Sequence, residues 1–404
     1  MHKPLEGIKV LEWGIFHAGP GGTAILGDMG AEVIKIEQPE SGDPLRVVAN
    51  YKNIDFNYGN NRNIFFDGAN RGKKSITIDL SRDEGLDIAY TLVKKSDVFL
   101  TNLREPTVNA KKMDYATLSA INPRLIYAGV SCFGTRGPDA NLGGFDYQGQ
   151  ARAGLMHCMG EPNEKPGVVQ FGIADQTTAI MGSYQIIIAL LMRERFGKGQ
   201  KVETSLLGTV SYMMYFNHVV ELITGREVSK HEQATADPQR NYYKCKDGKW
   251  IIHTANSRQE ENWQAVCKVL EITDLLDDPR YDSAEKRLAK SEVLVKRYNQ
   301  AFLKRPRHEW VQLFSERDLV ISPVNTVREA VQDPQLLENG YIVDYEDPEM
   351  GKIRIPGFPI QFSGAELNKN FRGPSLGEHT EEVLKSIGRY SESEIAEFRK
   401  KKII

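Results

Sequence analysis

One carboxylate in this chain combines a residue type and a position that suit covalent chemistry. Asp175 lies in the run Phe-Gly-Ile-Ala-Asp-Gln-Thr-Thr, which leads into a long apolar helical pattern over 179–192. A carboxylate at the start of a helix can accept hydrogen bonds from free backbone N–H groups, and the positive helix end keeps it ionised. Such a carboxylate can attack an acyl thioester and form a covalent acyl intermediate. The competing interpretation is an N-cap aspartate that only starts the helix.

The elements that would position Asp175 begin in the first 150 residues, where β-rich runs alternate with helical patterns. We predict a glycine-rich turn at 18–22 that leads into a helix ending at Met29, a helix over 84–95, and strands over 8–13, 31–37, 75–80, 97–100 and 125–130. This alternation, with few hairpin signals, predicts an α/β fold whose parallel sheet is flanked by helices. The helix at Asp175 would cover 176–196, followed by a strand at 201–204 and an apolar helical stretch at 205–222.

The chain changes character near Gly225. Residues 242–254 contain the turn Lys-Asp-Gly-Lys, which is typical of a hairpin, and residues 258–318 show the pattern of charged amphipathic helices. From 321 onward prolines and glycines punctuate the chain, which ends in a helical tail from Glu378. The block after Gly225 is therefore a candidate for a second, smaller domain.

Composition bounds the possible partners. The 404 residues suffice for two domains, and a formal net charge of -2 gives no bulk attraction for nucleic acid or an anionic membrane. The most apolar stretch, 186–192, is far shorter than the ~18 residues that cross a bilayer, and the N-terminus shows no signal-peptide pattern. The four cysteines stand far apart without metal-site spacing, as expected for free thiols in a reducing compartment. We therefore predict a cytoplasmic protein that binds neither nucleic acid nor membrane and holds no metal.

Charged residues near predicted strand ends offer a second chemical feature. Cations on successive strand–helix connections of one sheet converge at the edge where open α/β sheets bind ligands. Glu37 ends the second predicted strand, which is where a dinucleotide-binding fold has its ribose-binding acid. Coenzyme A, with a diphosphate and a 3′-phosphate, matches such a rim, and the helix start after the 18–22 turn offers N–H groups to an anion. For any one residue, a solvated surface cation is the simpler interpretation. The cations are Arg46, Arg71, Lys73, Lys74, Arg104, Lys111 and Lys112.

Segments distributed over nearly the whole chain carry a family resemblance. They include Pro4-Leu-Glu-Gly-Ile-Lys-Val-Leu11, Gly30-Ala-Glu-Val-Ile-Lys-Ile-Glu37, Asn70-Arg-Gly-Lys-Lys-Ser75, Gly134-Thr-Arg-Gly-Pro138, Gly197-Lys-Gly-Gln200 and Gly377-Glu-His-Thr380. In this order and spacing they resemble class III CoA-transferases, the family of formyl-CoA transferase and carnitine CoA-transferase.

The resemblance implies a fold, an assembly and a set of site residues. A large Rossmann-like domain with a parallel sheet would comprise residues 1–224 and 326–404 and bind CoA, with a smaller domain inserted over 225–325. Two subunits would form an interlocked homodimer. Asp175 falls on the family's catalytic aspartate. The positions that carry over as CoA contacts are His17, Ala18, Gln38, Ile78, Asp79, Leu80, Asn102, Leu103, Arg104, Lys111, Phe133 and Gly134.

The implied activity is transfer of CoA from an acyl-CoA to a free carboxylic acid. It would pass through an aspartyl mixed anhydride and an enzyme thioester, with CoA as a substrate and no tightly bound cofactor. Backbone N–H groups near Asp175 would stabilise the oxyanions.

Departures from formyl-CoA transferase bear on the substrate. His17 replaces a glutamine, Gln38 replaces an arginine, and the glycine-rich loop that closes over oxalate is not evident at 254–259. The stretch 241–250 is more similar to the branch that acts on 2-hydroxy acids such as phenyllactate or 2-hydroxyisocaproate. We therefore expect a 2-hydroxy, aryl or branched acceptor acid.

Two other functions are weighed against the transferase. An α-methylacyl-CoA racemase of the same fold needs a histidine–aspartate base pair, and racemases of this kind carry the histidine in a Gly-His-Asp sequence. Here the matching residues are Gly144, Phe145 and Asp146, so the base is absent. A non-catalytic subunit of a heteromeric pair would not need Asp175, so the presence of this residue argues against that role. Whether the protein also needs a second, different subunit stays open at this point.

Two residues have no assigned role. Arg258 could pair with an acceptor carboxylate or be an exposed cation at a helix start. Asp146 could cap the helix that begins near Tyr147.

Overall fold

The computed structural model describes residues 2–51, 54–58, 62–255 and 259–404. The chain forms two compact units. The larger unit consists of Met1–His157, Val168–Glu227 and Gly340–Ile404, and the smaller consists of Cys158–Gly167 and Val228–Asn339.

A six-stranded parallel sheet is the centre of the larger unit. Its order is β10-β9-β8-β1-β2-β7, and every neighbouring pair is parallel. Each strand that the sequence predicts in this half of the chain is present close to its predicted position, so the α/β fold with a parallel sheet is confirmed. The order reverses at β1, which pairs with β2 on one side and β8 on the other, and ligands of open α/β sheets bind where such a reversal occurs. The strands are β1 (Lys9–Trp13), β2 (Glu32–Glu37), β7 (Lys74–Thr77), β8 (Val98–Thr101), β9 (Ile126–Ser131) and β10 (Gln200–Ser205).

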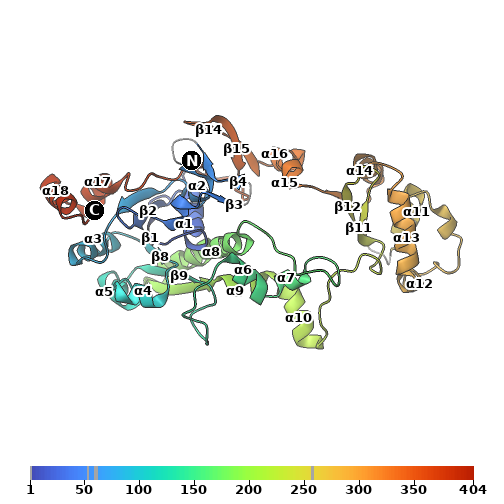
Figure 1. The fold of residues 1–404 in the computed structure, drawn as a ribbon, viewed down its shortest axis with the longest axis horizontal. Coiled ribbons are helices and arrows are strands. Elements are labelled where there is room, and N and C mark those ends of the chain that lie inside the picture. Colours follow the sequence, from blue (N-terminus) through green and yellow to red (C-terminus); the bar gives the residue numbers. More distant parts are fainter. Residues whose placement is uncertain (1, 52–53, 59–61, 256–258) are drawn as a thin grey trace. The chain divides into compact units, whose positions relative to one another are not determined.

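Helices cover both faces of this sheet because side chains alternate along each strand. On β1, Val10 faces α1 (Ala18–Asp28) and α8 (Ile173–Phe196), whereas Leu11 faces the opposite way. The second face is covered by α3 (Asp83–Val93), α5 (Tyr115–Ile121) and the C-terminal helices α17 (Thr380–Val383) and α18 (Glu392–Lys400). In Figure 1 these red C-terminal helices lie beside the blue α3, although the two segments come from opposite ends of the chain.

Close packing of α1 on α8 explains the glycine-rich turn. Every residue of α1 is buried. A Cβ at Gly22 would lie 3.1 Å from the backbone oxygen of Ala179, and one at Gly21 would lie 3.0 Å from the Ala179 Cβ. The N–H of Gly21 already donates to the carbonyl of His17. These glycines therefore allow the two helices to approach each other.

The remaining elements of the larger unit are short. They are η1 (Pro44–Val47), β3 (Asn50–Tyr51), β4 (Ile54–Asp55), β5 (Asn57–Tyr58), β6 (Arg62–Asn63), α2 (Ile64–Asn70), α4 (Glu105–Ala110), α6 (Asp146–Arg152), α7 (Leu155–Cys158), α9 (Leu206–Met213), α10 (Tyr215–Thr224), β14 (Ile342–Asp347), β15 (Gly351–Pro356) and η3 (Leu384–Gly388). The hairpin of β14 and β15 stands where the sequence suggested only proline- and glycine-rich chain.

The smaller unit has a three-stranded antiparallel sheet packed against helices. The predicted hairpin is present as β11 (Arg240–Lys244) and β12 (Trp250–Thr254), and β13 (Ile321–Val324) joins it. Aromatic side chains, among them Tyr243, Trp263 and Phe302, fill the core. The helices are α11 (Glu260–Val269), η2 (Thr273–Leu275), α12 (Ala284–Ala289), α13 (Ser291–Phe302), α14 (Arg307–Ser315), α15 (Val327–Ala330) and α16 (Pro334–Glu338).

A short segment from before α8 belongs to this smaller unit. Glu161 accepts hydrogen bonds from the hydroxyl of Tyr242 and from the N–H of Gln233. The four cysteines, all within the described parts of the chain, form no disulfide. Over the described parts of the chain, no helix has the length and apolarity that a membrane crossing requires.

Candidate functional site

Two consecutive left-handed residues turn the chain into α8. Phe171 has φ 65° and Gly172 has φ 83°. Glycine adopts this conformation freely, whereas for phenylalanine it costs on the order of 1 kcal/mol. Gly172 is the N-cap and offers no side-chain acceptor, and α8 begins at Ile173. Asp175 is thus the third residue of the helix and not its N-cap.

The first-turn N–H groups of α8 are taken by a different carboxylate. Oδ1 of Asp146, the first residue of α6, accepts from the N–H of Ala174 at 2.6 Å and from that of Asp175 at 3.0 Å. The expectation that Asp175 itself accepts these hydrogen bonds is therefore wrong. So is the hypothesis that Asp146 caps its own helix, because its side chain reaches a different helix, α8, which starts at Ile173. The sequence could not show this because the capping partner is remote.

Burial and a neighbouring charge shift the protonation of Asp175. Burial, followed by the negative charge of Asp146, raises the pKa of the Asp175 carboxyl to about 7. The expectation that the helix end keeps this group firmly ionised is wrong, because the N–H groups that would favour the charged form are already engaged. Within the described residues, the Asp175 carboxylate accepts no hydrogen bond, so its lone pairs are available for attack.

His17 joins the loop after β1 to the start of α8. Its Nε2–H donates to Oε1 of Gln176 at 2.6 Å. Burial lowers the pKa of the His17 imidazole, and the charges of Arg71 and Lys73 act in the same direction, against the hydrogen bond to Gln176. His17 is therefore a neutral hydrogen-bonding group next to Asp175 at neutral pH.

The predicted CoA contacts all follow carboxyl ends of strands of the one sheet, except Lys111, which follows α4. His17 and Ala18 follow β1, Gln38 follows β2, and Ile78 to Leu80 follow β7. The other two groups are Asn102, Leu103 and Arg104 after β8, and Phe133 and Gly134 after β9. Parallel strands end at a common edge, so the fold gathers these positions there.

Their side chains differ in what they can offer a ligand. Ile78 and Leu80 are buried in the hydrophobic core, which leaves only their backbone. Hydrogen bonds from Ser81 lower the pKa of Asp79, and contributions from Gln38 and Lys111 act in the same direction, so these two lie close to Asp79.

Asn102 fixes the loop that leads from β1 to His17. Its Oδ1 accepts from the N–H of Ile15 at 2.9 Å, and its Nδ2 donates to the carbonyl of Ile15 at 2.7 Å. These two hydrogen bonds join the ends of β1 and β8, the neighbouring strands at which the order of the sheet reverses. Asn102 therefore shapes the edge of the sheet at this point.

A cavity of 310 Å³ opens beside the ends of β8 and β9. Asn102, Leu103 and Arg104 line one part of it, and Cys132 and Gly144 line another. Burial raises the pKa of the Cys132 thiol to about 11, and the charge of Asp175 contributes, so the cavity wall lies near that carboxylate. The thiol stays protonated at neutral pH and does not compete as a nucleophile.

Three of the seven predicted phosphate-binding cations, Arg46, Arg71 and Lys73, instead pair with buried carboxylates of the protein. Arg46 pairs with Glu37, and Ser75 also donates to this glutamate, which is buried and cannot bind a ribose. The predicted roles of these residues are therefore wrong. Arg104 remains at the cavity and Lys111 remains near Asp79. The other internal pairs are Arg71–Asp28 and Lys73–Glu12. Lys74 forms partly exposed pairs with Glu32 and Glu382.

A buried charge cluster beneath α1 was missed by sequence reasoning. Glu12 on β1 faces Lys35 on β2 in register, and their side chains form an ion pair at 2.8 Å. Nζ of Lys73 binds the other Glu12 oxygen and the carbonyl of Pro20, which lies in α1. Charged residues inside otherwise apolar strands were the available signal, because such residues in a parallel sheet must be paired.

Two positions of interest lie outside the described residues. Arg258 is one of them, and residues 256–258, half of the stretch 254–259 where a glycine-rich loop was sought, are the other.

Comparison with known proteins identifies the family. Residues 5–380 match CoA-transferase family III. The chain belongs to this family. It is 31% identical over 405 residues to the (R)-2-hydroxy-4-methylpentanoate CoA-transferase of Clostridioides difficile, covering 99% of both chains. It is 29% identical over 398 residues to human succinyl-CoA:glutarate CoA-transferase, covering 98% of this chain and 88% of the relative. A CAIB/BAIF family protein from Brucella suis matches its fold with a TM-score of 0.84 and 28% identity, covering 96% of this chain and 100% of that one.

This protein is therefore a class III acyl-CoA:carboxylate CoA-transferase, which moves CoA between acyl-CoA esters and carboxylic acids. The predicted enzyme class is confirmed. CoA esters are its substrates.

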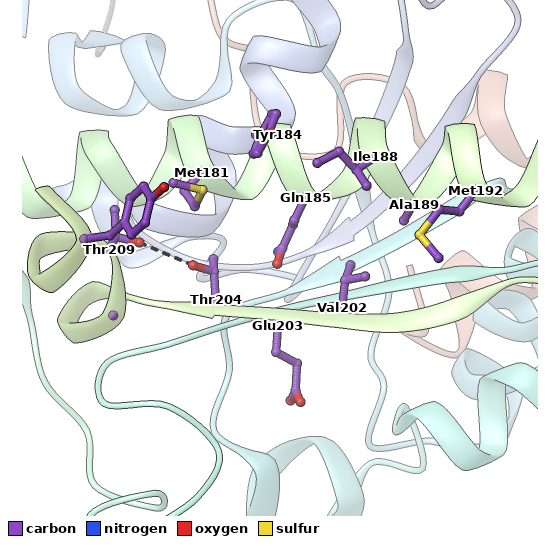
Figure 2. Close-up of a pocket in the computed structure, with 12 residues that line it drawn as sticks. Met181, Tyr184, Gln185, Ile188, Ala189, Met192, Val202, Glu203, Thr204 and Thr209 are labelled. Carbon is purple, nitrogen blue, oxygen red and sulfur yellow. Dashed lines mark hydrogen bonds between the residues drawn. The ribbon is translucent and has the colours of Figure 1, made fainter. Parts of the chain in front are cut away.

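The transferase has a second cavity, of 440 Å³, along the middle of α8. Figure 2 shows Gln185 pointing from α8 toward β10, while Glu203 points away on the other side of that strand. Tyr184, Ile188 and Met192 on α8 and Tyr212 on α9 supply exposed apolar side chains around it. Asp175 does not line this cavity.

Proposed function

We propose that the transferase acts through covalent intermediates on Asp175. The carboxylate attacks the carbonyl carbon of the donor thioester, the C–S bond breaks, and CoA leaves as a thiolate, giving an aspartyl mixed anhydride. The thiolate then attacks the aspartyl carbonyl, releasing the donor acid and forming an aspartyl–CoA thioester. An acceptor carboxylate repeats the two steps in reverse, which yields the new acyl-CoA and regenerates Asp175.

The state of the Asp175 carboxylate supports this proposal. It accepts no hydrogen bond from the described residues, it lies near the cavity wall at Cys132, and its pKa is raised to about 7. Perturbed carboxylates next to a cavity are candidates for reactive groups. A carboxylate stripped of hydrogen bonds is also a better nucleophile than a solvated one.

Side-chain groups take over part of the expected oxyanion stabilisation. The N–H groups of Ala174 and Asp175 already donate to Asp146, so they are not available to an oxyanion. Gln176 accepts from His17 through Oε1, which orients its amide NH2 as a donor beside Asp175. We assign this amide the role that backbone N–H groups were expected to fill.

We propose a 2-hydroxy, branched or aryl acid as the acceptor. The ring of Phe171, in the turn that leads into α8, packs edge-on against Tyr51 and Phe56. Phe145 packs on Phe16, the residue before His17. Aromatic side chains before the first turn of α8 would favour apolar acyl groups over dicarboxylates, and the Clostridioides difficile relative acts on a branched 2-hydroxy acid by its name.

We propose that CoA binds to a Rossmann-like domain formed by residues 1–224 and 326–404, with 225–325 as the inserted domain. The larger unit, which ends its middle segment at Glu227 and resumes at Gly340, contains the sheet of this domain. Numbered along the chain, its strands follow the order 6-5-4-1-2-3, which is that of doubly wound nucleotide-binding sheets. In this proposal Arg104 and Lys111 bind phosphate groups, and the loops at His17 and Phe133 guide the pantetheine arm toward Asp175.

We propose further that two copies of the chain form an interlocked homodimer. α10 has no buried residue, although Phe216 and Leu222 on it are apolar and 80% exposed. Together with the apolar rim of the 440 Å³ cavity they form a surface of the kind that protein interfaces cover. Nε2 of Gln185, which is buried and has no partner among the described residues, would gain an acceptor from the second copy.

A racemase is disfavoured by the residue at the position of its base. Phe145 stands where the racemase histidine would, and its 65% exposed ring has no atom that can take up a proton. The nearest histidine in sequence, His157, faces Glu227 at 3.6 Å.

The test is to trap the acyl-enzyme. The protein is incubated with single acyl-CoA donors and acceptor acids, quenched with hydroxylamine, digested and analysed by mass spectrometry. We expect a hydroxamate on Asp175 with productive donors, CoA transfer to branched or aryl 2-hydroxy acids, and loss of both in Asp175→Asn. Asp333→Asn, which changes an N-cap of the smaller unit, is the matched control. Residual turnover of Asp175→Asn within about tenfold of wild type, a barrier change of only ~1.4 kcal/mol, would contradict the proposal.

A further inference from the structure

Asp146 is held in a frame of hydrogen bonds directly at the start of α8. It is 8% exposed. Its Oδ1 accepts from the N–H groups of Ala174 and Asp175, and its Oδ2 accepts from Nε2 of Gln150 at 2.5 Å. A carboxylate with three donors on two oxygens has a fixed orientation.

Gln150 extends this frame to the segment that enters α8. Its side chain is fully buried. It donates to the carbonyl of Val169 at 2.8 Å and accepts from the N–H of Val169 at 3.1 Å. α6 therefore fixes both the approach to α8 and the first turn of the helix, so the carboxylate of Asp146 stays close to that of Asp175.

We propose that Asp146 is a positioning residue for Asp175, which occupies the free N–H groups of the helix start and places a negative charge beside the attacking carboxylate. This inference rests on the proposed covalent role of Asp175. If the helix N–H groups bonded to Asp175 instead, they would stabilise its charged form and weaken it as a nucleophile. By taking these donors, Asp146 leaves the lone pairs of Asp175 free.

The cations near the start of α8 are paired with other carboxylates. Arg152 of α6 pairs with Asp139 at 2.5 Å, and Arg71 and Lys73, whose charges act on His17, pair with Asp28 and Glu12. His17, just before α1, has a lowered pKa, and the Cys132 thiol, just after β9, has a raised one, so both are neutral near pH 7. α9 contains no charged residue. On β10, Lys201 and Glu203 pair with each other at 2.7 Å. Asp146 is thus the charge that acts on Asp175 together with burial.

The substitution Asp146→Asn removes the charge and keeps an oxygen that can accept from the two N–H groups of α8. Its NH2 replaces the oxygen that accepts from Gln150, so this one hydrogen bond is lost with the charge. We expect the single-turnover rate of acyl-enzyme formation to fall at its plateau. We also expect the acid limb of its pH profile to move to lower pH by roughly half a unit or more, because the ionised form of Asp175 becomes easier to reach. A purely structural role would lower the rate equally at all pH values.

The controls make each outcome decisive. Asp333→Asn, the N-cap of α16, should leave both the rate and the profile unchanged. Asp146→Ser, a second uncharged acceptor, should reproduce the shift. Should neither Asp146 variant fold, an acid limb near pH 4 in the wild-type profile would overturn the inference, and one near pH 7 would support it. An unlabelled Asp175 in the wild type would overturn the proposed function and this inference together. A labelled Asp175 with an unmoved acid limb in Asp146→Asn would overturn only the role of Asp146.

Discussion

Nε2 of His17 and Oε1 of Gln176 lie 2.6 Å apart, which joins the residue that opens α1 to the residue that follows Asp175 in α8. The two helices also pack directly on each other at Gly22 and Ala179. A loop proposed to bind CoA and a helix that carries the proposed nucleophile are therefore held in a fixed relation.

Breaking this contact should impair catalysis more than folding. For His17→Ala we expect kcat/KM for acyl-CoA to fall about tenfold, since one hydrogen bond of about 1 kcal/mol is lost and the Gln176 amide loses its orientation. His17→Gln, which can still donate to Gln176, should recover most of the activity. Steady-state kinetics of both variants test this, and equal losses would argue against an orienting role.

The raised pKa of Asp175 also predicts an effect on stability. A carboxyl whose pKa is about 7 in the folded state and near 3.8 when unfolded destabilises the fold once it ionises. Wild-type stability should therefore decline as the pH rises from about 4 to 7. Asp175→Asn should be more stable than the wild type above pH 7, by roughly 2 kcal/mol after allowance for partial exposure of the carboxyl, and should gain little below pH 4. Urea denaturation at pH 4.5 and pH 8 measures the difference, and equal stability at both pH values would contradict the shift.

The buried ion pairs of Glu12 should be essential for folding. Glu12→Gln would leave Lys73 buried without its counter-charge and Lys35 paired only with Asp43, so we expect a loss of about 3–5 kcal/mol. Despite burial, the charges of the two lysines lower the pKa of Glu12 to about 2. Its stabilising contribution is thus complete above pH 4.5 and disappears as the pH falls toward 2.

A matched control for Glu12→Gln is an ion pair at the surface. Lys286→Ala removes an exposed partner of Asp282 and should change the unfolding free energy by less than about 1 kcal/mol. Urea denaturation near neutral pH compares the two variants. Equal losses would show that the Glu12 cluster contributes no more than a surface pair.

Substitution of Arg104 and of Arg46 by alanine should have different effects, although the sequence predicted both as phosphate-binding cations. Arg104 lines the 310 Å³ cavity, so Arg104→Ala should raise KM for acyl-CoA about tenfold or more through the loss of a charge-assisted hydrogen bond. Arg46 pairs with buried Glu37, so Arg46→Ala should lower stability while KM of the folded enzyme stays within about twofold. Parallel measurements of KM and urea midpoints distinguish the two, and a KM effect in Arg46→Ala would place that residue in the CoA site.

The exposed apolar surface of α10 should be covered in solution. We expect the wild type to be a dimer by light scattering and Phe216→Asp or Leu222→Asp to shift it toward monomers, because a charge would be buried at the interface. Val327→Asp introduces the same charge at an exposed apolar residue of the smaller unit and serves as the control. A monomeric wild type would exclude the homodimer.

The sheet could be predicted strand by strand because its signals are local. β1 and β9 are short apolar runs bounded by turns, and the alternation with helices predicted a parallel sheet. The hairpin of β14 and β15 was not predicted, because its prolines and glycines resemble those of irregular chain. Of the site, Asp175 was found from its neighbours in sequence, whereas its interaction with Asp146 was not, because that residue lies in a separate helix.

The sequence alone determined the α/β class, the order of the strands along the chain and the choice of Asp175, since hydrophobic patterns and turn residues act over a few positions. Only the tertiary structure decided which charges are free. In the structure, Arg46 and Lys73 form ion pairs with buried glutamates and Arg104 lines a cavity. The N–H groups at the start of α8 donate to Asp146. The physical reason is that desolvation and ion pairing depend on which residues the fold brings within a few ångströms, whatever their separation along the chain.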